Sequence, residues 1–559
     1  MNGARLMTVK NVLRKALEQA VMNAQNRGII ISTTLPDFVI EHPQNREHGD
    51  YASNLPLKLA RSAGLTPVEL AEKVIELMPP ISEVSTITVA PPGFINFSLN
   101  PAWMVKEVDH ILVDRATYGK IEIGNNQKVQ IEFVSGNPTG PLHVGHGRGA
   151  VLGSTLANVL QIAGYNVERE YYINDAGSQL DAFNRTLLAR YKQYHGIDVE
   201  IPDDGYMGNY MNELAQEIAG EKGDKFLSLP ENEAVKEIGN IGVRKVMDWI
   251  RKDLESLGVI FDVWFSEQSL FTLGLYEKVL SLLRKNGYVV EKENATWFIS
   301  SMLGENKDNV LVRSDGTPTY FATDIAYHYD KFIERKFNKV INIWGADHHG
   351  HVSRMKLVVG AFGINPDNLN VIICQLVTLK RGDEVLKISK RSGDIITLQE
   401  LIDEVGKDAC RFVFLLRSAD SQMDFDLELA KKQSADNPVY YVQYAHARIS
   451  SILRLAAQTG IDYKRGDVTI LKSEPELELI KQMLFLPEIV ETVATLFEPH
   501  HLPYYAMELA TKFHSFYKQC RVISEDQPVT LARLKLVDAA QIVLAKVLTL
   551  MGMTAPESM

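Results

Sequence analysis

The chain has 559 residues, of which 45% are hydrophobic and 23% charged, and it is longer than one hydrophobic core usually supports, so several domains are expected. The composition excludes a disordered, fibrous or repeat protein, and no apolar run reaches the roughly twenty residues of a membrane span. The formal charge of −11 weighs mildly against a nucleic-acid partner, although it does not exclude a local positive groove.

The start of the chain, MNGARLMTVKNVLRKALEQA, is typical of an amphipathic helix and not of a signal peptide. The three cysteines, Cys374, Cys410 and Cys520, lie far apart and form no CxxC pair, so we expect neither disulfides nor structural zinc. These features predict a cytoplasmic protein.

Residues 1–120 predict a compact α+β domain. A helix is expected over residues 8–26, and HGDYASNLPLKLARSAGLTPVELAEKVIELM also has apolar residues at helical spacing. The stretch STITVAPPGFINFSL is β-rich, which adds strands to this module.

A βαβ unit is predicted from Lys128 onward. KVQIEFVS is a β-branched run, GNPTGP is a loop, GHGRGAVLGSTLANVLQIAGY is a helix that closes at Gly164, and NVEREYYI is the next strand. This order implies a parallel sheet with its ligand at the carboxyl ends of the strands.

The rest of the chain completes the α/β domain and adds a helical one. Residues 180–305 are charged and mostly helical, and they predict an insertion. The α/β pattern resumes with LVRSDGTPTYFATDIAYHYDKF, a strand KVINIWG, a loop ADHHGH, a helix from about Val352 and a strand NVIICQLVTL. After KISKRSGDIITLQEL every periodic segment is helical. We therefore expect an α/β domain over residues 121–405 and a helix bundle over 406–559.

The stretch NPTGPLHVGHGRGA places two histidines, His143 and His146, at a turn from strand to helix. Such a turn aims main-chain N–H groups and the helix dipole at one point, which suits an anion. Three glycines leave room for a ligand at the first helical turn: Gly145, Gly147 and Gly149. The two histidines are then candidate donors to a phosphoryl group. The alternative is a helix start whose histidines only cap or pack.

A second histidine-rich loop, GADHHGH, offers possible metal ligands: Asp347, His348, His349 and His351. The loop also follows a parallel strand at the carboxyl edge of the sheet, where polar residues line any nucleotide pocket. No HExxH helix accompanies it. Both a metallohydrolase centre and a nucleotide pocket stay open at this point.

The stretch LKISKRSG gathers cationic and polar side chains beside a glycine: Lys387, Ser389, Lys390, Arg391 and Gly393. Two lysines and an arginine on a loop can clamp a polyphosphate leaving group. A short charge run is otherwise a solvated loop, so the interpretation depends on its pairing with HVGH at the other end of a split sheet.

HVGH resembles the HIGH signature of class I aminoacyl-tRNA synthetases, and KISKR resembles their KMSKS signature, in the same order and on either side of a long insertion. Further segments are similar to arginyl-tRNA synthetases: EFVSGNPTGPLHVGHGRGA, VRSDGTPTYFATDIAYHYDKF, WGADHHGHVSRMK, DFDLELA, NPVYYVQYAHARI, HGDYASNLPLKLA and PGFINFSL. The resemblance implies a multidomain α/β protein with a class I Rossmann-like catalytic domain that carries an insertion, an N-terminal α+β tRNA-binding domain and a C-terminal all-α anticodon-binding bundle.

The same resemblance implies a ligase that activates L-arginine with ATP and transfers it to the terminal adenosine of tRNA(Arg). His143 and His146 would stabilise the α-phosphorus, and Lys387 and Lys390 would neutralise the pyrophosphate. The implied ATP contacts are Gly145, Gly147, Gly149, Asp347, His348 and Ser389. Magnesium (Mg2+) would accompany ATP through the phosphates. The family is usually monomeric and generally needs bound tRNA even for activation.

Arginine recognition requires rigid acceptors, because a guanidinium offers five donors in a planar fork and is always charged. The resemblance points to Asp324 and Tyr320, four residues apart on a probable helix, with Asp324 pairing with the guanidinium. Ser135 and Asn137 would hold the α-amino and carboxylate ends. Glu291 in VVEKENATWF is a further match, but the family's Asp-Gly-Ala reads Glu-Asn-Ala here, and an exposed strand-end glutamate is the alternative.

Partner recognition is expected in the outer domains. Two aromatic pairs at helical spacing can stack on bases or belong to the core: Tyr440 with Tyr444, and Phe513 with Tyr517. The resemblance assigns Tyr517 and the terminal Met559 to the anticodon pocket, and Phe94 and Asn96 to the outer corner of the tRNA.

Three alternatives to this interpretation remain: another class I synthetase, a metallohydrolase that uses the His/Asp loops, and an inactive paralogue that only binds RNA. A pure RNA-binding module has no reason to keep four of these side chains together: His143, His146, Lys387 and Lys390.

Overall fold

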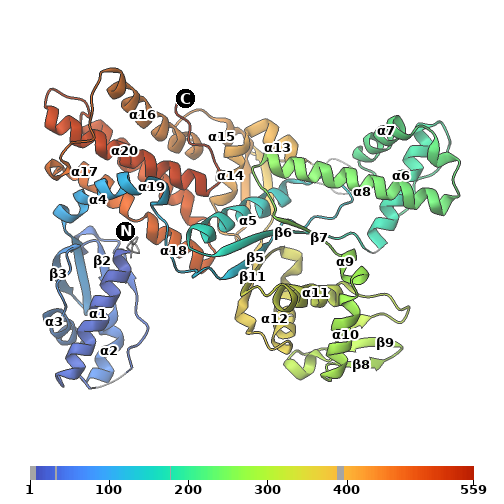
Figure 1. Ribbon diagram of the computed structural model, residues 1–559, viewed down its shortest axis with the longest axis horizontal. Coiled ribbons are helices and arrows are strands. Elements are labelled where there is room, and N and C mark those ends of the chain that lie inside the picture. The colour runs from blue at the N-terminus through green and yellow to red at the C-terminus, as the bar shows by residue number, and fades with distance from the viewer. Residues whose placement is uncertain (1–7, 32–33, 177, 387–395) are drawn as a thin grey trace.

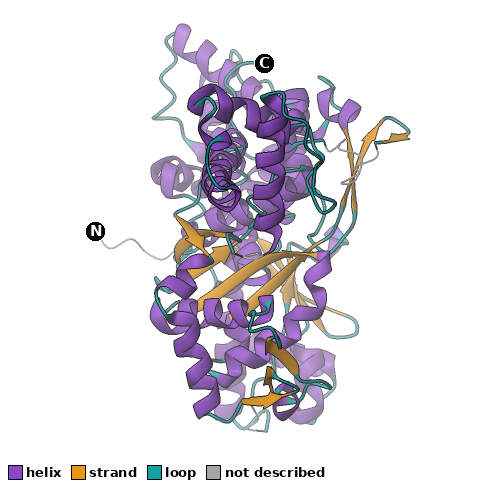
Figure 2. Ribbon diagram, turned by 90° about the vertical axis from the view of Figure 1, so that its right-hand side faces the viewer, coloured by secondary structure: helices purple, strands orange, loops and turns teal. Residues whose placement is uncertain are grey.

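The computed structural model describes residues 8–31, 34–176, 178–386 and 396–559. Figure 1 shows the N-terminal domain in blue at the lower left, the C-terminal helices in orange and red above it, and two lobes at the right. In Figure 2 the strands of the main sheet lie at the middle of the molecule, between helices above and below. Of the helices that the structure describes, none is long and apolar enough to cross a membrane.

The N-terminal domain is the α+β unit expected from the sequence. Its antiparallel sheet has the order β1-β2-β4-β3. In β4, Ile95, Phe97 and Leu99 are buried, whereas Phe94 and Ser98 at alternate positions stay partly exposed. The elements are α1 (Val9–Asn26), β1 (Ile40–Glu41), β2 (Tyr51–Ser53), α2 (Leu55–Ala63), α3 (Pro67–Glu76), β3 (Val84–Ala90), β4 (Phe94–Leu99) and α4 (Pro101–Asp114).

The central domain contains the predicted parallel sheet, with the order β12-β11-β5-β6-β7. All four pairings are parallel, and the chain returns to the middle between β5 and β11. In doubly wound sheets this reversal point is where ligands bind, at the carboxyl ends of the strands. The elements are β5 (Lys128–Glu132), α5 (Val144–Ile162), β6 (Asn166–Ile173), β7 (Val263–Ser266), β11 (Lys339–Gly345) and β12 (Leu369–Cys374).

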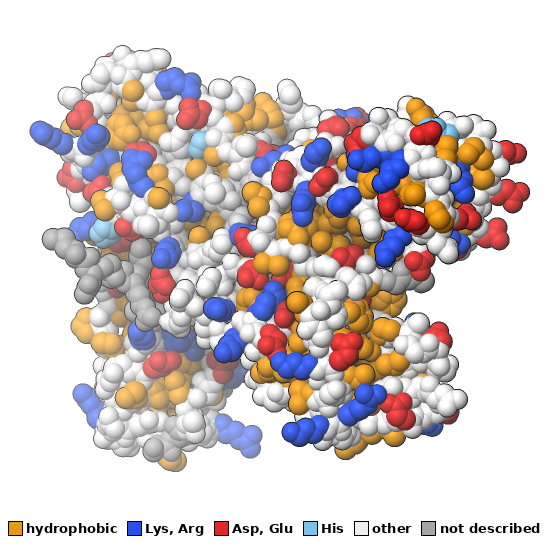
Figure 3. Space-filling view, turned by 45° about the vertical axis from the view of Figure 1, so that its right-hand side comes forward, with side chains coloured by type: hydrophobic (Ala, Val, Ile, Leu, Met, Phe, Trp, Pro, Cys, Tyr) orange, Lys and Arg blue, Asp and Glu red, His pale blue; other side chains and the backbone are white. Residues whose placement is uncertain are grey.

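The range 180–305, expected to be one insertion, contains a strand of the main sheet. β7 pairs in parallel with β6, so the chain leaves the sheet twice. The first excursion is a helical arm: α6 (Ser178–Tyr194), α7 (Tyr210–Lys222) and α8 (Glu231–Ser256). The second is α9 (Gln268–Thr272), α10 (Leu275–Lys285) and a small sheet of β8 (Val289–Lys292), β9 (Ala295–Phe298) and β10 (Asn309–Val312). Figure 3 shows two separate lobes with a hollow between them.

The predicted strand NVIICQLVTL is in fact two strands of different sheets. The Gln375 N–H donates to Ala419 O at 2.9 Å, which takes the chain out of the β12 ladder. β13 (Val377–Arg381) then pairs with β14 (Glu384–Val385) and with β15 (Met423–Asp426). β15 is also an exception to the all-helical prediction for the C-terminal part. Because NVIICQLVTL is a continuous apolar run, its residues do not indicate that it divides between two sheets.

The helical elements complete the two halves of the molecule. α11 (Tyr320–Tyr329) runs directly into a π-helical turn, Asp330–Glu334. After β11 come a 3-10 turn, Ala346–His351, and α12 (Val352–Ala361). The C-terminal helices are α13 (Leu398–Val405), α14 (Lys407–Leu415), α15 (Leu427–Lys431), α16 (Pro438–Gln458), α17 (Glu474–Leu484), α18 (Leu486–Leu496), α19 (His501–Gln519) and α20 (Gln527–Leu550).

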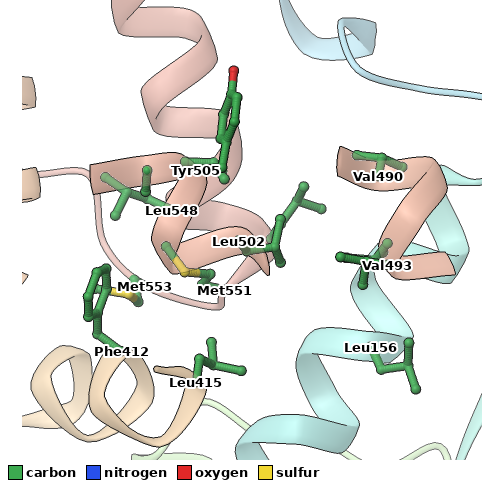
Figure 4. Close-up of a cluster of buried hydrophobic side chains, with 14 of the residues drawn as sticks. Leu156, Phe412, Leu415, Val490, Val493, Leu502, Tyr505, Leu548, Met551 and Met553 are labelled. Carbon is green, nitrogen blue, oxygen red and sulfur yellow. The ribbon is translucent and has the colours of Figure 1, made fainter. Parts of the chain in front are cut away.

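The bundle and the central domain share one hydrophobic core. Figure 4 shows Leu156 of α5 near Val493 of α18, with Phe412 and Leu415 of α14 below Leu502 of α19. These side chains are all buried. Burial of this kind fixes the bundle against α5, the helix that begins at the HVGH motif.

Arg411 of α14 is completely buried where three parts of the chain meet. Its guanidinium donates to the carbonyl oxygens of Met551 and Leu257, which follow the ends of α20 and α8, and to the hydroxyls of Ser154 and Thr155 on α5. Burial lowers the pKa of Arg411 to about 10. The negative ends of two helix dipoles help to stabilise this buried cation.

We expect Arg411→Met to lower the melting temperature by about 2 to 4 °C, equivalent to about 3 kcal/mol, because two carbonyls and two hydroxyls lose their donor. Differential scanning fluorimetry measures the shift. The control is Arg465→Met, on the exposed link between α16 and α17. Equal shifts in the two variants would contradict the structural role of Arg411.

Candidate active site

The candidate site begins where α5 starts. His143 is the N-cap of α5: its Nδ1 accepts from the Gly145 N–H at 3.1 Å, and its own N–H donates to His146 Nδ1 at 3.2 Å. The two rings stack with centroids 3.8 Å apart. Since each Nδ1 is an acceptor, each neutral ring carries its proton on Nε2. The histidines therefore cap the helix and also provide N–H donors at its positive end, as an anion site requires.

The three glycines of this helix start have different surroundings. Gly145 is exposed, and a Cβ added at Gly149 would meet no atom within 4 Å. At Gly147, in contrast, a Cβ would lie 2.7 Å from Leu398 Cδ1. Gly147 thus permits close packing of α13 on α5, which is a different reason for glycine from the ligand access that we expected there.

The chain returns to this helix start shortly after the second signature stretch. His143 forms an isolated antiparallel bridge with Thr397, and the Leu398 N–H donates to Leu142 O at 2.8 Å. Thr397 comes six residues after the KISKR stretch, so the first described residues on that side of the signature are bound to the HVGH motif. Three predicted phosphate contacts lie outside the described residues: Lys387, Ser389 and Lys390.

Three carboxyl groups lie close together beside this turn. Glu132 ends β5, Glu267 follows β7 and is 3% exposed, and Asp324 lies on α11. Burial, together with the negative charges of Glu132 and Glu267, raises the pKa of Asp324 to about 8. Burial also raises the pKa of Glu267 to about 7. Carboxyl groups held in this way favour a cationic ligand, because a cation restores their ionised form.

The predicted amino-acid contacts Ser135 and Asn137 border this acidic cluster. Ser135 Oγ donates to Glu132 Oε1 at 3.0 Å. The Asn137 amide lies 3.2 Å from that of Asn174, which in turn approaches Glu267 Oε2 to 2.6 Å. The turn after β5, the carboxylate after β7 and the helix α11 therefore surround one site.

The two other predicted arginine contacts differ in their placement. Tyr320 is the first residue of α11, one turn before Asp324, and is 52% exposed. Glu291 lies on β8 with a side chain 61% exposed, and it pairs with Arg284 at 2.9 Å. The hydrogen bond from Arg284 lowers the pKa of Glu291. The structure therefore brings Glu267 to Asp324, whereas Glu291, on a strand of the small sheet, pairs with Arg284 of α10.

The histidine-rich loop forms the 3-10 turn Ala346–His351. The side chains of Asp347 and His348 are 81% and 56% exposed, and Asp347 Oδ2 lies 3.5 Å from His348 Nε2. In the part of the chain that the structure describes, one group of three side chains could hold a metal ion, in the link between α18 and α19: Glu498, His500 and His501. The loop after β11 therefore gives no support to a metallohydrolase.

The predicted tRNA contacts of the first domain lie on β4. Phe94 is partly exposed, and Asn96 is on the same face, 4% exposed. Asn96 Oδ1 has no hydrogen-bond partner among the described residues. A buried orphan acceptor beside a partly exposed aromatic ring is compatible with contact to a polar ligand.

The predicted anticodon contacts lie in the bundle. Phe513 is buried in the core, whereas Tyr517, one turn later, is 38% exposed with the Arg448 guanidinium 5.0 Å above its ring. Met559 is 54% exposed and, with Tyr440, lines a cavity of about 500 Å³. The aromatic pair thus divides between core and surface.

Sequence reasoning missed two charged residues of the site, Glu267 and Lys331. Glu267 directly follows the short strand β7, so its position was hidden when that strand was taken as insertion. Lys331 is completely buried and donates to Glu132 at 2.7 Å. A buried lysine carries no signal in the sequence until its partner is known.

Three family models match successive parts of the chain. An arginyl-tRNA synthetase N-terminal domain matches residues 7–99, the class I (R) tRNA synthetase catalytic domain matches 107–450, and a DALR anticodon-binding domain matches 442–559. The middle model alone covers more than half of the chain.

Individual relatives give the same result. The chain is 58% identical to the arginine–tRNA ligase of Dehalococcoides mccartyi (strain CBDB1), over 99% of this chain and 100% of that protein. It is 48% identical to that of Heliobacterium modesticaldum (strain ATCC 51547 / Ice1), over 99% of each. The arginyl-tRNA synthetase structure from Thermus thermophilus superposes with a TM-score of 0.79 at 22% identity, over 99% of this chain and 100% of that chain, a likeness of fold.

Proposed function

Because the chain belongs to the arginyl-tRNA synthetases, a family of class I aminoacyl-tRNA synthetases, it is an arginine–tRNA ligase, and we propose that the acidic pocket after β5 and β7 binds its L-arginine. The observation that carries this proposal is the convergence of Asp324 and Glu267 in one pocket. Two carboxylates from different elements match the planar fork of a guanidinium. Ser135 and Asn137 take the α-amino and α-carboxylate ends, and Tyr320 lies at the entrance.

ATP binds at the start of α5 in this proposal. The Nε2–H groups of His143 and His146 and the helix N-terminus act on the α-phosphate. Gly145 and Gly149 leave room for the nucleotide, and Asp347 and His348 contact it from the turn after β11. Three residues of the second signature would hold the departing pyrophosphate: Lys387, Ser389 and Lys390.

The reaction has two steps. An oxygen of the arginine carboxylate attacks the α-phosphorus of ATP, the bond from that phosphorus to the bridging oxygen breaks, and pyrophosphate leaves with the electron pair. The 2′-hydroxyl of the tRNA's terminal adenosine then attacks the carbonyl carbon of the adenylate, and AMP leaves. Positioning of the reacting atoms supplies most of the rate enhancement, because the protein forms no covalent bond.

The remaining parts of the proposal rest on the family resemblance. Magnesium arrives on the ATP phosphates, which fits a nucleotide end whose described side chains offer no three-ligand group. Four residues contact tRNA(Arg): Phe94, Asn96, Tyr517 and Met559. The protein acts as a cytoplasmic monomer, with domains at residues 1–120, 121–405 and 406–559.

Arginine binding should strengthen as the pH rises from 6 to 8.5. The guanidinium pairs with the ionised forms of Asp324 and Glu267, whose pKa values in the empty site are about 8 and about 7. Below pH 7 both groups are largely protonated, so binding must expel protons; above pH 8 it need not. We expect the Kd of L-arginine to fall by about tenfold or more across this range.

Isothermal titration calorimetry in buffers of different ionisation enthalpy measures both the Kd and the protons released per arginine. ATP binding over the same pH range is the control, because its phosphates contact other side chains. A flat arginine Kd without proton release would show that these two carboxyl groups do not receive the guanidinium.

A further inference from the structure

A buried chain of hydrogen bonds runs behind the arginine pocket, and its central residue is Lys331. The lysine is completely buried, donates to Glu132 Oε2 at 2.7 Å and to Asn342 Oδ1 at 3.1 Å, and lies 3.9 Å above the ring of Tyr327. Asn342 on β11 is the register partner of Glu132 on β5. The ammonium group of Lys331 is thus directed at groups inside the protein.

A strained turn lies at one end of this chain of hydrogen bonds. Val134 has φ 70° and Ser135 has φ 42°, and the Ser135 N–H donates to Phe133 O at 3.0 Å, which makes a γ-turn. Positive φ is costly for a β-branched residue such as Val134 and persists only when the surroundings enforce it. The enforcing contacts are those of Ser135 Oγ, which donates to Glu132 at 3.0 Å and accepts from the Tyr172 N–H at 3.1 Å.

The other end of the chain of hydrogen bonds reaches Asp324. The amide nitrogen of Asn342 lies 2.9 Å from His328 Nε2, and His328 Nδ1 lies 2.8 Å from Asp324 O. Since the carbonyl can only accept, Nδ1 carries the proton and Nε2 accepts from Asn342. His328 is 1% exposed, and burial lowers its pKa to about 3, so it stays neutral and this arrangement is fixed.

One continuous helical segment supplies both ends. The π-helical turn Asp330–Glu334 follows α11 without a break and contains Lys331. Asp324 and Lys331 are seven residues apart, which is close to two turns of a helix, so both side chains face Glu132.

We propose that Lys331 is a positioning residue that sets the length of the arginine pocket, because it joins the strained turn at Ser135 to the backbone of Asp324 through three buried side chains, those of Glu132, Asn342 and His328. This rests on the proposed function, in which Ser135 takes the α-amino end and Asp324 takes the guanidinium. Lys331 also neutralises Glu132, so the guanidinium meets Asp324 and Glu267 and is not drawn to a third carboxylate.

The test is the KM of arginine in aminoacylation with saturating ATP and cognate tRNA for Lys331→Met. We expect that KM to rise about 10- to 100-fold, with the KM of ATP within about twofold of wild type. The ratio of kcat/KM for arginine to that for homoarginine, which is one methylene longer, should fall by about tenfold, since a released turn no longer fixes the pocket length. If Lys331 were purely structural, its substitution would change neither the arginine-to-homoarginine ratio nor the KM of arginine relative to the KM of ATP.

The pH profile gives a second readout. The groups that face Asp324 are Glu132 from β5, Glu267 after β7, Tyr172 from β6, His328 on α11 and Lys331 in the π-turn that follows it. Lys331 is the nearby cation that lowers the pKa of Asp324, so its removal should move the rise in arginine affinity to higher pH. An unmoved profile would count against the proposal.

The matched control is Lys535→Met, the same substitution in a largely buried lysine that pairs with Asp109 on α4 at 2.8 Å. It should leave the arginine KM and the homoarginine ratio unchanged. If Lys331→Met does not fold, Glu132→Gln/Lys331→Met decides, because removal of both charges strands no buried carboxylate. Wild-type arginine KM and selectivity in that double variant would overturn the proposal. Absence of arginine-dependent activity in the wild type would instead overturn the proposed function.

Discussion

Asp324→Asn should raise the KM of arginine by about 30- to 5,000-fold, because loss of one partner of an enclosed charge pair costs about 2 to 5 kcal/mol. The asparagine has nearly the same shape, so the helix α11 and its packing are retained. Aminoacylation kinetics with arginine varied at saturating ATP and tRNA measure the effect, and the KM of ATP should stay within about twofold.

The control for this variant is Asp315→Asn, the same chemical change at an exposed aspartate just before α11. Asp315 only organises its own turn, with its carboxylate accepting from the Thr317 N–H at 2.9 Å. Unchanged arginine KM in Asp324→Asn, or an equal rise in Asp315→Asn, would show that Asp324 is not the guanidinium partner.

His146→Ala should slow adenylate formation by about 100- to 1,000-fold, because it removes a donor aimed at the α-phosphate. Its effect on tRNA affinity should be within about twofold. Rapid-quench measurement of adenylate formation and a filter-binding assay for tRNA separate the two quantities. Equal losses in both would mean that His146 is structural.

A second substitution separates catalysis from helix capping. His146 accepts the His143 N–H at 3.2 Å, and His146→Asn can still accept it through the amide oxygen. We expect His146→Asn to keep the melting temperature of the wild type and still lose most of the rate. His110→Ala, at an exposed histidine of α4, is the control and should leave the rate unchanged.

The sequence predicted those elements whose periodicity is long and whose ends carry clear signals. The helix after HVGH and the strand NVEREYYI agree with α5 and β6, because a turn with glycine and proline precedes the helix and Gly164 ends it. The four residues of β7 are too few to show a period, and their pairing with β6 was invisible in sequence.

That single omission explains why Glu267 was not among the predicted arginine contacts. Glu291 was named from the family resemblance, and it lies on an exposed strand beside Arg284. Glu267 comes to Asp324 only through the parallel pairing of β7 with β6. Sites built at the ends of several strands depend on the strand order, which local sequence does not contain.

Lys331 illustrates a different limit. The helical period over TPTYFATDIAYHYDKF places it seven residues after Asp324, on the same face of the helix. Lysine is almost never fully buried unless it is paired, and its partner Glu132 lies on a strand far away in the sequence. The pattern therefore indicates the face, and only the fold shows that the lysine is buried there.

Arginine-dependent ATP–pyrophosphate exchange, measured with and without cognate tRNA, tests the central claim most directly. We predict exchange with arginine when tRNA is bound, and none with lysine or with citrulline, which has the length of arginine but no positive charge. Absence of exchange with arginine under both conditions would contradict the assignment of this site, and exchange with citrulline at the same rate would contradict the role of its carboxylates.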